Sequence, residues 1–168
     1  MTKGYIEFFS SNPRYRRLWA ASVISLLGEW FNTIALFLLI LHYSGSEFLL
    51  GILFAVRMLL FGISQPINGL LADRFNRKSL MFWSNIFQIG FALMFLFVDG
   101  EEDMWWLIAV SGLMMLLHGV YVTAERAAVP NIVDEEDLIT ANAIGSASWS
   151  TALCLGAMLG GIVVSQWG

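Results

Sequence analysis

The sequence is poor in charge and almost without cysteine. Only 13% of its 168 residues are Asp, Glu, Lys or Arg, whereas a soluble domain carries about 25%. This deficit excludes an ordinary soluble globular domain. A single cysteine, Cys154, excludes a disulfide-stabilised scaffold. A net charge of −4 excludes a protein that holds nucleic acid on a basic surface.

The sequence also lacks the short motifs of enzymes and of ATP-driven pumps. It contains no H-E-x-x-H metal motif, no nucleophile elbow of the G-x-S-x-G type and no phosphate-binding loop of the G-x-x-x-x-G-K type. His118 has no second histidine near it in the sequence with which to bind a metal. We therefore expect no enzyme activity, no metal site and no bound cofactor.

What the sequence has in excess is apolar side chains, which make up 58% of the residues. They gather in five runs, each close to or longer than the ~20 residues with which a helix crosses a bilayer. Lipid offers no partner to free backbone groups, so each run is predicted to be a helix. The first run is too long for a signal-peptide core, and no small-residue cleavage site follows it. The predicted fold is an all-α integral membrane protein with a cytoplasmic segment, 1–17, and a partial transmembrane bundle, 18–168, whose spans lie at about 18–41, 48–72, 80–98, 104–124 and 138–164.

The basic residues predict how these helices are oriented. With the N-terminus in the cytoplasm, the loops 42–47 and 99–103 face outward, and neither contains Lys or Arg. Every Lys and Arg except Arg57 then lies on the cytoplasmic side, as the positive-inside rule requires. The acidic residues of 99–103 are expected in a solvated outer turn. Those of 134–137 are expected in a solvated cytoplasmic loop, or in the acidic first turn of the fifth helix.

The cytoplasmic loop between the second and third runs has a distinctive sequence. It reads Gly-Leu-Leu-Ala-Asp-Arg-Phe-Asn-Arg-Lys over residues 69–78. Gly69 lets the end of a helix approach a neighbour closely. Asp73, flanked by arginines, could form an ion-pair latch that opens when two helical bundles rock apart. A plain basic loop would need neither of these two residues.

This loop resembles the cytoplasmic signature G-x-x-x-D-R-x-x-R-K of the major facilitator superfamily at each defined position, namely Gly69, Asp73, Arg74, Arg77 and Lys78. The resemblance implies a transporter of twelve helices in two six-helix halves, of which this chain would hold five helices of the N-terminal half. It also implies a latch that holds the two halves in the outward-facing state, formed by Asp73, Arg74, Arg77, Glu125 and Arg126. The segments 124–130 and 137–143 are similar to those of siderophore exporters and macrolide-efflux-like transporters in that family.

The fifth run carries three glycines, Gly156, Gly160 and Gly161, whose spacing favours close packing of helices. It also resembles the end, G-P-x-x-G-G, of the motif associated with antiporters in the same family. Ala157 stands where that motif has proline, and the upstream glycines would fall on Ala143 and Ala152. The match is therefore partial, and close helix packing alone also accounts for the glycines.

Ionisable residues at membrane depth are costly and are therefore candidates for function. Glu29, Arg57 and His118 lie in the central parts of the first, second and fourth runs. Polar residues recur around them at helical spacing, so these helices are expected to turn a polar face toward a cavity. We predict that Glu29 pairs with Arg57 and carries a coupling proton, with His118 in the relay. The alternative is a static buried ion pair that fixes helix register.

Two further residues are predicted to line the cavity, Asn32 in the first run and Tyr121 in the fourth. Tyr121 could stack on an aromatic ligand together with Trp149 and Phe31. Arg57 has an alternative role, which is to attract an anionic substrate.

The function predicted from these residues and from the resemblance is secondary active transport. We expect proton-coupled efflux of a small amphipathic molecule, such as a drug, a macrolide or a siderophore, by alternating access. The expected partners are the lipid bilayer, a small-molecule substrate, protons and a missing C-terminal half, and the expected location is the bacterial cytoplasmic membrane. We expect the chain to be incomplete, because five helices hold no second half to rock against the first. An importer of the same family and a transport-incompetent membrane subunit or scaffold are the alternatives.

Overall fold

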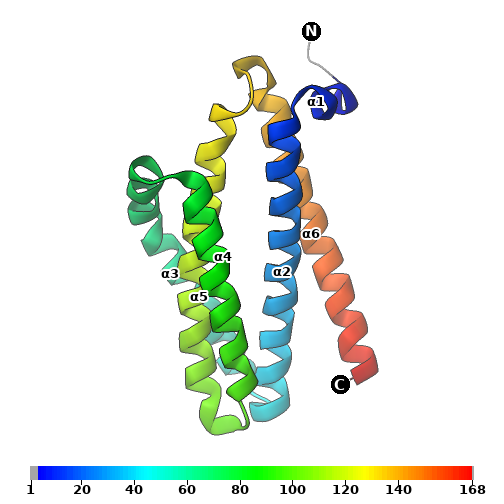
Figure 1. The fold of residues 1–168 in the computed structure, drawn as a ribbon. Coiled ribbons are helices and arrows are strands. Elements are labelled where there is room, and N and C mark those ends of the chain that lie inside the picture. Colours follow the sequence, from blue (N-terminus) through cyan, green and yellow to red (C-terminus); the bar gives the residue numbers. More distant parts are fainter. Residues whose placement is uncertain (1–3, 168) are drawn as a thin grey trace. The chain divides into compact units, whose positions relative to one another are not determined.

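The computed structural model describes residues 4–167, which form helices joined by short turns, without a β-strand among them (Figure 1). At positions 157, 160, 161 and 163–167 only the helical backbone is described. The elements in chain order are α1 (Tyr5–Ser11), α2 (Pro13–Ser44), α3 (Glu47–Arg74), α4 (Arg77–Met94), η1 (Phe95–Phe97), η2 (Glu101–Asp103), α5 (Met104–Ala128), η3 (Val129–Asn131), η4 (Glu135–Asp137) and α6 (Leu138–Trp167).

Four segments of the described chain are helical, long and apolar enough to cross a membrane. They are α2, α3, the stretch Arg77–Phe97 that contains α4, and the stretch Glu101–Asn131 that contains α5. The fifth predicted run, 138–164, lies within α6. The prediction of an all-helical membrane fold is confirmed.

The helix ends follow local signals in the sequence. α2 begins at Pro13, whose fixed φ suits the first position of a helix. Gly45 and Ser46 alone join α2 to α3, and Gly45 has a φ of +59°, a left-handed conformation that glycine adopts without steric cost. Ser46 then caps α3 by accepting a hydrogen bond from the Leu49 backbone N–H at 3.3 Å.

The chain forms two compact units, which are described separately. Unit 1 comprises the described residues up to Ile34 together with Glu125–Trp167, and unit 2 comprises Ala35–Ala124. Unit 1 therefore holds α1, the first part of α2, and α6. Unit 2 holds the last part of α2, then α3, α4 and most of α5.

The core of unit 1 lies where α1, α2 and the start of α6 meet. Phe8 of α1 is fully buried and packs edge-on against Tyr15 of α2, with ring centroids 4.9 Å apart. Phe9 meets Trp19 in the same way at 5.0 Å. These rings pack on apolar residues that precede and begin α6, which are Val129, Ile132, Val133, Leu138, Ala141 and Ile144. The segment before α2 is thus fixed to unit 1 by buried aromatic side chains.

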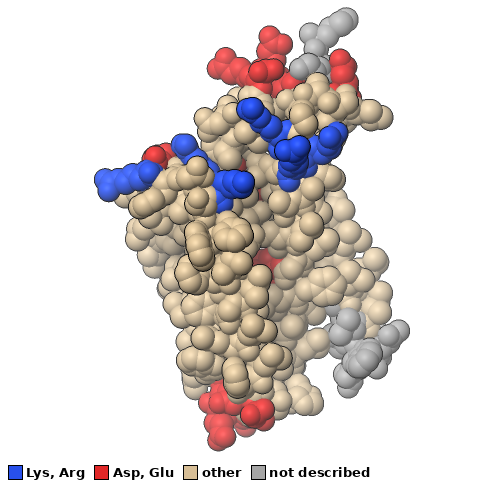
Figure 2. Space-filling view, viewed as in Figure 1, with Lys and Arg blue, Asp and Glu red and all other residues tan. Residues whose placement is uncertain are grey.

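The core of unit 2 is built around α5. Leu107 of α5 is fully buried and packs with Leu53 of α3 and with Leu36 and Ile40 of α2. The basic side chains of the α3–α4 turn and the acidic side chains of the α4–α5 turn lie at opposite ends of this unit, with a largely apolar surface between them (Figure 2). Such a surface suits a hydrocarbon layer bounded by two polar ends.

Candidate functional site

In unit 1, side chains of α2 donate hydrogen bonds across to α6. The Tyr15 hydroxyl donates to the Ala141 carbonyl at 2.7 Å, and Trp19 Nε1 donates to Ser148 Oγ at 2.8 Å. The later donor on α2, Trp19, pairs with the later acceptor on α6, Ser148, so the two helices run in the same direction here (Figure 1). We call this contact between the two helices the α2–α6 seam.

The acidic residues before α6 correct one of the expectations. Asp134, Glu135 and Glu136 are exposed, as a solvated loop requires, but Asp137 is only 3% exposed. The Asn12 side-chain amide donates to Asp137 Oδ2 at 3.2 Å. Asp137 therefore ties the start of α6 to the α1–α2 turn, and its carboxylate is also well placed against the positive end of the α6 dipole.

Further along the seam, Gly156 of α6 lies directly against Trp30 of α2. A Cβ added at Gly156 would lie 2.5 Å from Trp30 Cβ and 2.9 Å from Trp30 Cγ. At this point only glycine lets the two helices come so close. The surroundings of Gly160 and Gly161 lie outside the described residues.

Replacing Tyr15 by phenylalanine is expected to lower the stability of the folded protein by about 0.5–1.5 kcal/mol. The change removes the hydroxyl that donates to Ala141 and leaves the buried ring in place. Thermal unfolding of the protein in mild detergent measures the loss. Tyr5→Phe is the matched control, since Tyr5 is 64% exposed. Equal shifts in the two variants would contradict the role of the hydrogen bond.

In unit 2, small and polar residues line the contact between α3 and α5. A Cβ added at Gly112 would lie 2.7 Å from Leu60 Cδ1, and one added at Gly119 would lie 2.6 Å from Asn68 Nδ2. Asn68 is 2% exposed, and its amide donates to Ser64 Oγ at 2.9 Å. The two helices are therefore held close by glycines and by a buried polar pair.

Three of the predicted cavity residues belong to unit 2. Arg57 is 4% exposed and Tyr121 is 2% exposed, so both are enclosed by protein. The His118 ring lies beside Phe61, with ring centroids 6.2 Å apart. The Tyr121 ring is thus enclosed by protein in unit 2, and its stacking on a ligand stays a prediction.

The other two predicted cavity residues, Glu29 and Asn32, belong to unit 1. Both are half-buried on α2. The Thr33 hydroxyl donates to Glu29 Oε1 at 3.4 Å, one turn away on the same helix. Because Arg57 belongs to unit 2, its pairing with Glu29 stays a prediction. Within the part of the chain that the structure describes, His, Cys, Asp and Glu form no group of three that could hold a metal ion.

The signature loop of 69–78 spans the end of α3 and the start of α4. Gly69 lies one turn before Asp73, and Asp73 and Arg74 end α3 with exposed side chains. Arg77 and Lys78 follow in the first turn of α4. Asp73, Arg74 and Lys78 are exposed, whereas Arg77 is half-buried.

The remaining two residues of the predicted latch are in unit 1. A side-chain hydrogen bond joins Glu125 of α5 to Ser22 of α2, and Arg126 is exposed. Glu125 therefore has a partner on α2, which the sequence did not indicate. Its place in a cluster with Asp73 stays a prediction.

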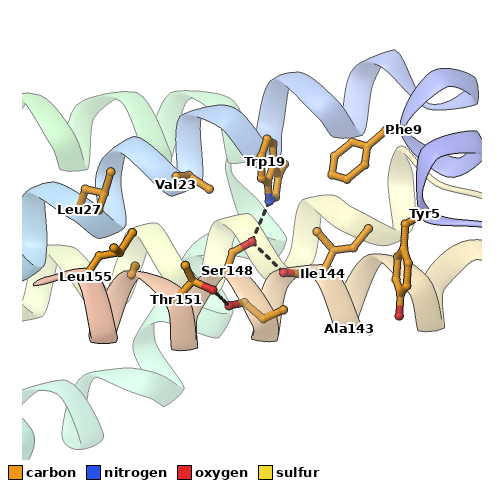
Figure 3. Close-up of a pocket in the computed structure, with 12 residues that line it drawn as sticks. Tyr5, Phe9, Trp19, Val23, Leu27, Ala143, Ile144, Ser148, Thr151 and Leu155 are labelled. Atoms are coloured by element: carbon orange, nitrogen blue, oxygen red, sulfur yellow. Dashed lines mark hydrogen bonds between the residues drawn. The ribbon is translucent and has the colours of Figure 1, made fainter.

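Unit 1 also contains a pocket of about 420 Å³ (Figure 3). α2 contributes Trp19, Val23 and Leu27 to its wall. α1 contributes Tyr5 and Phe9 at one end. α6 supplies the opposite wall, with Ala143, Ile144, Ala147, Ser148, Thr151, Ala152 and Leu155.

These features define a polytopic helical membrane protein with a charged turn between two of its spans and polar residues at mid-helix. The chain belongs to the Major Facilitator Superfamily, whose family model matches residues 18–168. Members of this family are transporters and not enzymes. An uncharacterized MFS-type transporter of Bacillus subtilis (strain 168), YfiS, is 29% identical over 163 residues, which are 95% of this chain and 38% of that protein. The chain therefore spans less than half of the length of the relative that it matches.

The contacts of the α2–α6 seam were missed from the sequence. The residues that pair there are separated by 126 residues for Tyr15 and Ala141 and by 129 for Trp19 and Ser148. A helical periodicity shows which residues share a face, but it does not show which distant helix that face meets. The aromatic residues ahead of Pro13, which are Tyr5, Phe8 and Phe9, were a local signal in the sequence, and Phe8 is fully buried in unit 1.

Proposed function

We propose that this chain provides helices of the N-terminal half of a proton-coupled exporter, which moves a small amphipathic molecule by alternating access. The observation that carries the proposal is Glu29, a carboxylic acid half-buried at mid-helix in α2 of a chain that belongs to a transporter family. Placing an ionisable carboxyl group at membrane depth costs free energy, so its presence there indicates a function.

Glu29 would take up and release the coupling proton. Removal from water favours the neutral carboxylic acid, and a nearby cation favours the carboxylate, so a change in surroundings changes how firmly the proton is held. Arg57 is the cation that we propose for this role, with His118 as a second proton carrier. The Thr33 hydroxyl donates to Glu29 Oε1 and so holds this side chain along α2.

The charges of Asp73, Arg74 and Arg77 would latch the cytoplasmic ends of two halves together in the outward-facing state, along with Glu125 and Arg126. The exposure of Asp73 and Arg74 at the α3–α4 turn supports this role. The proposal places the N-terminus in the cytoplasm of a bacterial cell and a C-terminal half of the same transporter opposite these helices. The substrates that we propose are those of the siderophore-exporter and macrolide-efflux branch.

Glu29→Gln in the natural full-length protein is expected to abolish the dependence of transport on the proton gradient. Glutamine keeps the size and the hydrogen bonding of the side chain but holds no exchangeable acid proton. Inverted membrane vesicles that overproduce the protein are energised with a pH gradient, and accumulation of a macrolide, a catecholate siderophore and a cationic dye is measured.

Glu47→Gln is the matched control, because Glu47 is an exposed glutamate at the start of α3. Gradient-driven accumulation should be kept by the control and lost by Glu29→Gln. Accumulation that stays gradient-dependent in Glu29→Gln would end the coupling proposal. Uptake into right-side-out vesicles instead of inverted ones would show an importer, and transport in neither would favour a membrane subunit.

A further inference from the structure

The pocket of unit 1 offers its occupant hydrocarbon and almost no free polar group. Its wall is apolar except for Ser148, Thr151, the Trp19 indole N–H and the Tyr5 hydroxyl at one end. Ser148 Oγ donates to the Ile144 carbonyl at 2.8 Å, and Thr151 Oγ1 donates to the Ala147 carbonyl at 2.8 Å (Figure 3). Both hydroxyls are thus satisfied within α6, and the Trp19 N–H donates to Ser148. Between α2 and α6 a polar ligand would therefore gain little, and an alkyl chain would leave none of these groups unpaired.

The length of the pocket matches one leaflet of a bilayer. Its wall on α6 runs from Ala143 to Leu155, which at a rise of 1.5 Å per residue is about 18 Å. One leaflet contributes about 15 Å, half of a ~30 Å hydrocarbon core. The aromatic rings of Tyr5 and Phe9 line the pocket at the end where α2 begins, and such rings favour the boundary between hydrocarbon and headgroups.

A positive charge stands at the same end. Arg16 is exposed and precedes Trp19 by three residues and Val23 by seven, so it shares the face of α2 that lines the pocket. Arg14 is also exposed, but its position on the helix turns it to the opposite side. The pocket therefore combines an apolar slot of leaflet depth with a cation at its mouth.

We propose that this pocket binds an anionic phospholipid, with one acyl chain between α2 and α6 and the headgroup phosphate at Arg16. The charge at the mouth selects an anionic headgroup over a zwitterionic one, because a basic residue near a membrane surface favours anionic lipid. The slot selects a lipid over a free phosphate, since the alkyl chain supplies the buried apolar area. This binding does not depend on the role proposed for Glu29.

Native mass spectrometry of the natural full-length protein tests the proposal. The protein is delipidated in mild detergent and titrated with phosphatidylglycerol or phosphatidylcholine of identical acyl chains. One phosphatidylglycerol is expected to bind more tightly than phosphatidylcholine, and glycerol phosphate without acyl chains is expected not to compete. Equal binding of the two lipids would overturn the proposal.

Two pairs of variants locate the site. Arg16→Gln should weaken the binding of phosphatidylglycerol about fivefold, the factor expected for one basic residue at an anionic surface, while Arg14→Gln should leave it unchanged. Ala147→Phe fills the pocket and should remove the bound lipid. Ser146→Phe should not, because Ser146 is exposed on the face of α6 that turns away from the pocket.

A thermal-unfolding measurement shows that each variant is folded before it is titrated. Retained binding in folded Ala147→Phe would overturn the proposal. The proposal would also be overturned if the wild-type full-length protein bound no phosphatidylglycerol and Ala147→Cys formed a cross-link to a cysteine in a later helix. That helix would then occupy the pocket.

Discussion

Gly156→Ala is expected to destabilise the protein by about 1–3 kcal/mol, the cost of forcing an extra methyl group into a close-packed contact. The new Cβ would lie 2.5 Å from Trp30 Cβ. That atom is bonded to the backbone of α2, so no rotation of the tryptophan side chain can move it away. The two helices would have to separate along the seam, and the Trp19–Ser148 hydrogen bond would lengthen with them.

Gly145→Ala in the same helix is the matched control, because a Cβ there meets nothing within 4 Å. Alanine favours the helix over glycine by up to about 1 kcal/mol, so this control should be neutral or stabilising. Melting temperatures in mild detergent compare the two. Similar melting temperatures for Gly156→Ala and Gly145→Ala would refute the close contact. So would an equal loss of stability from Gly156→Ala in a Trp30→Gly background, because the Trp30 side-chain atoms that oppose the new methyl group are absent there.

Asp73→Asn is expected to reduce transport by the natural full-length protein about tenfold or more, within the range of energetic coupling between distant sites. Asp73 is an exposed carboxylate in the last turn of α3, next to Arg74. A negative charge at this end of a helix opposes the helix dipole, so its removal should leave the stability of the fold unchanged or slightly higher. Loss of transport would therefore report the loss of the proposed latch and not a loss of folded protein.

Asp99→Asn serves as the control for Asp73→Asn, because Asp99 is an exposed acid in the turn between α4 and α5. Transport in inverted vesicles is compared after normalisation to the amount of protein in the membrane. The control should transport at the wild-type rate. Wild-type transport by Asp73→Asn would leave the latch without support.

Helices could be predicted from the sequence more readily than contacts. A membrane helix satisfies its own backbone, so an apolar run of sufficient length determines it without reference to the rest of the chain. The ends of the helices also depend on local residues, as at Gly45 and at the capping residue Ser46. α1 was not predicted as a helix, because seven residues are too few for a periodic signal, and its position depends on Phe8 packing against Tyr15.

In the candidate site, too, the features that depend on neighbouring residues could be predicted and the contacts between distant residues could not. The α3–α4 turn was found from its pattern because all of its residues are consecutive. Asp137 was misplaced in solvent because its partner, Asn12, is remote in the sequence. The burial of Tyr121 depends on the neighbours of α5, and a polar position on a helical face does not reveal whether water or another helix covers it.

The seam between α2 and α6 has a consequence for biosynthesis. The Tyr15 hydroxyl finds its acceptor 126 residues later in the chain. At a synthesis rate of about 5–20 residues per second, α2 waits on the order of 6–25 s for this partner to emerge. During that interval Tyr15 and Trp19 lie without their hydrogen-bond acceptors on α6, and a chain that stops before residue 138 lacks them altogether. The contact can therefore form only after α3, α4 and α5, which lie between the two helices in the chain, have been synthesised.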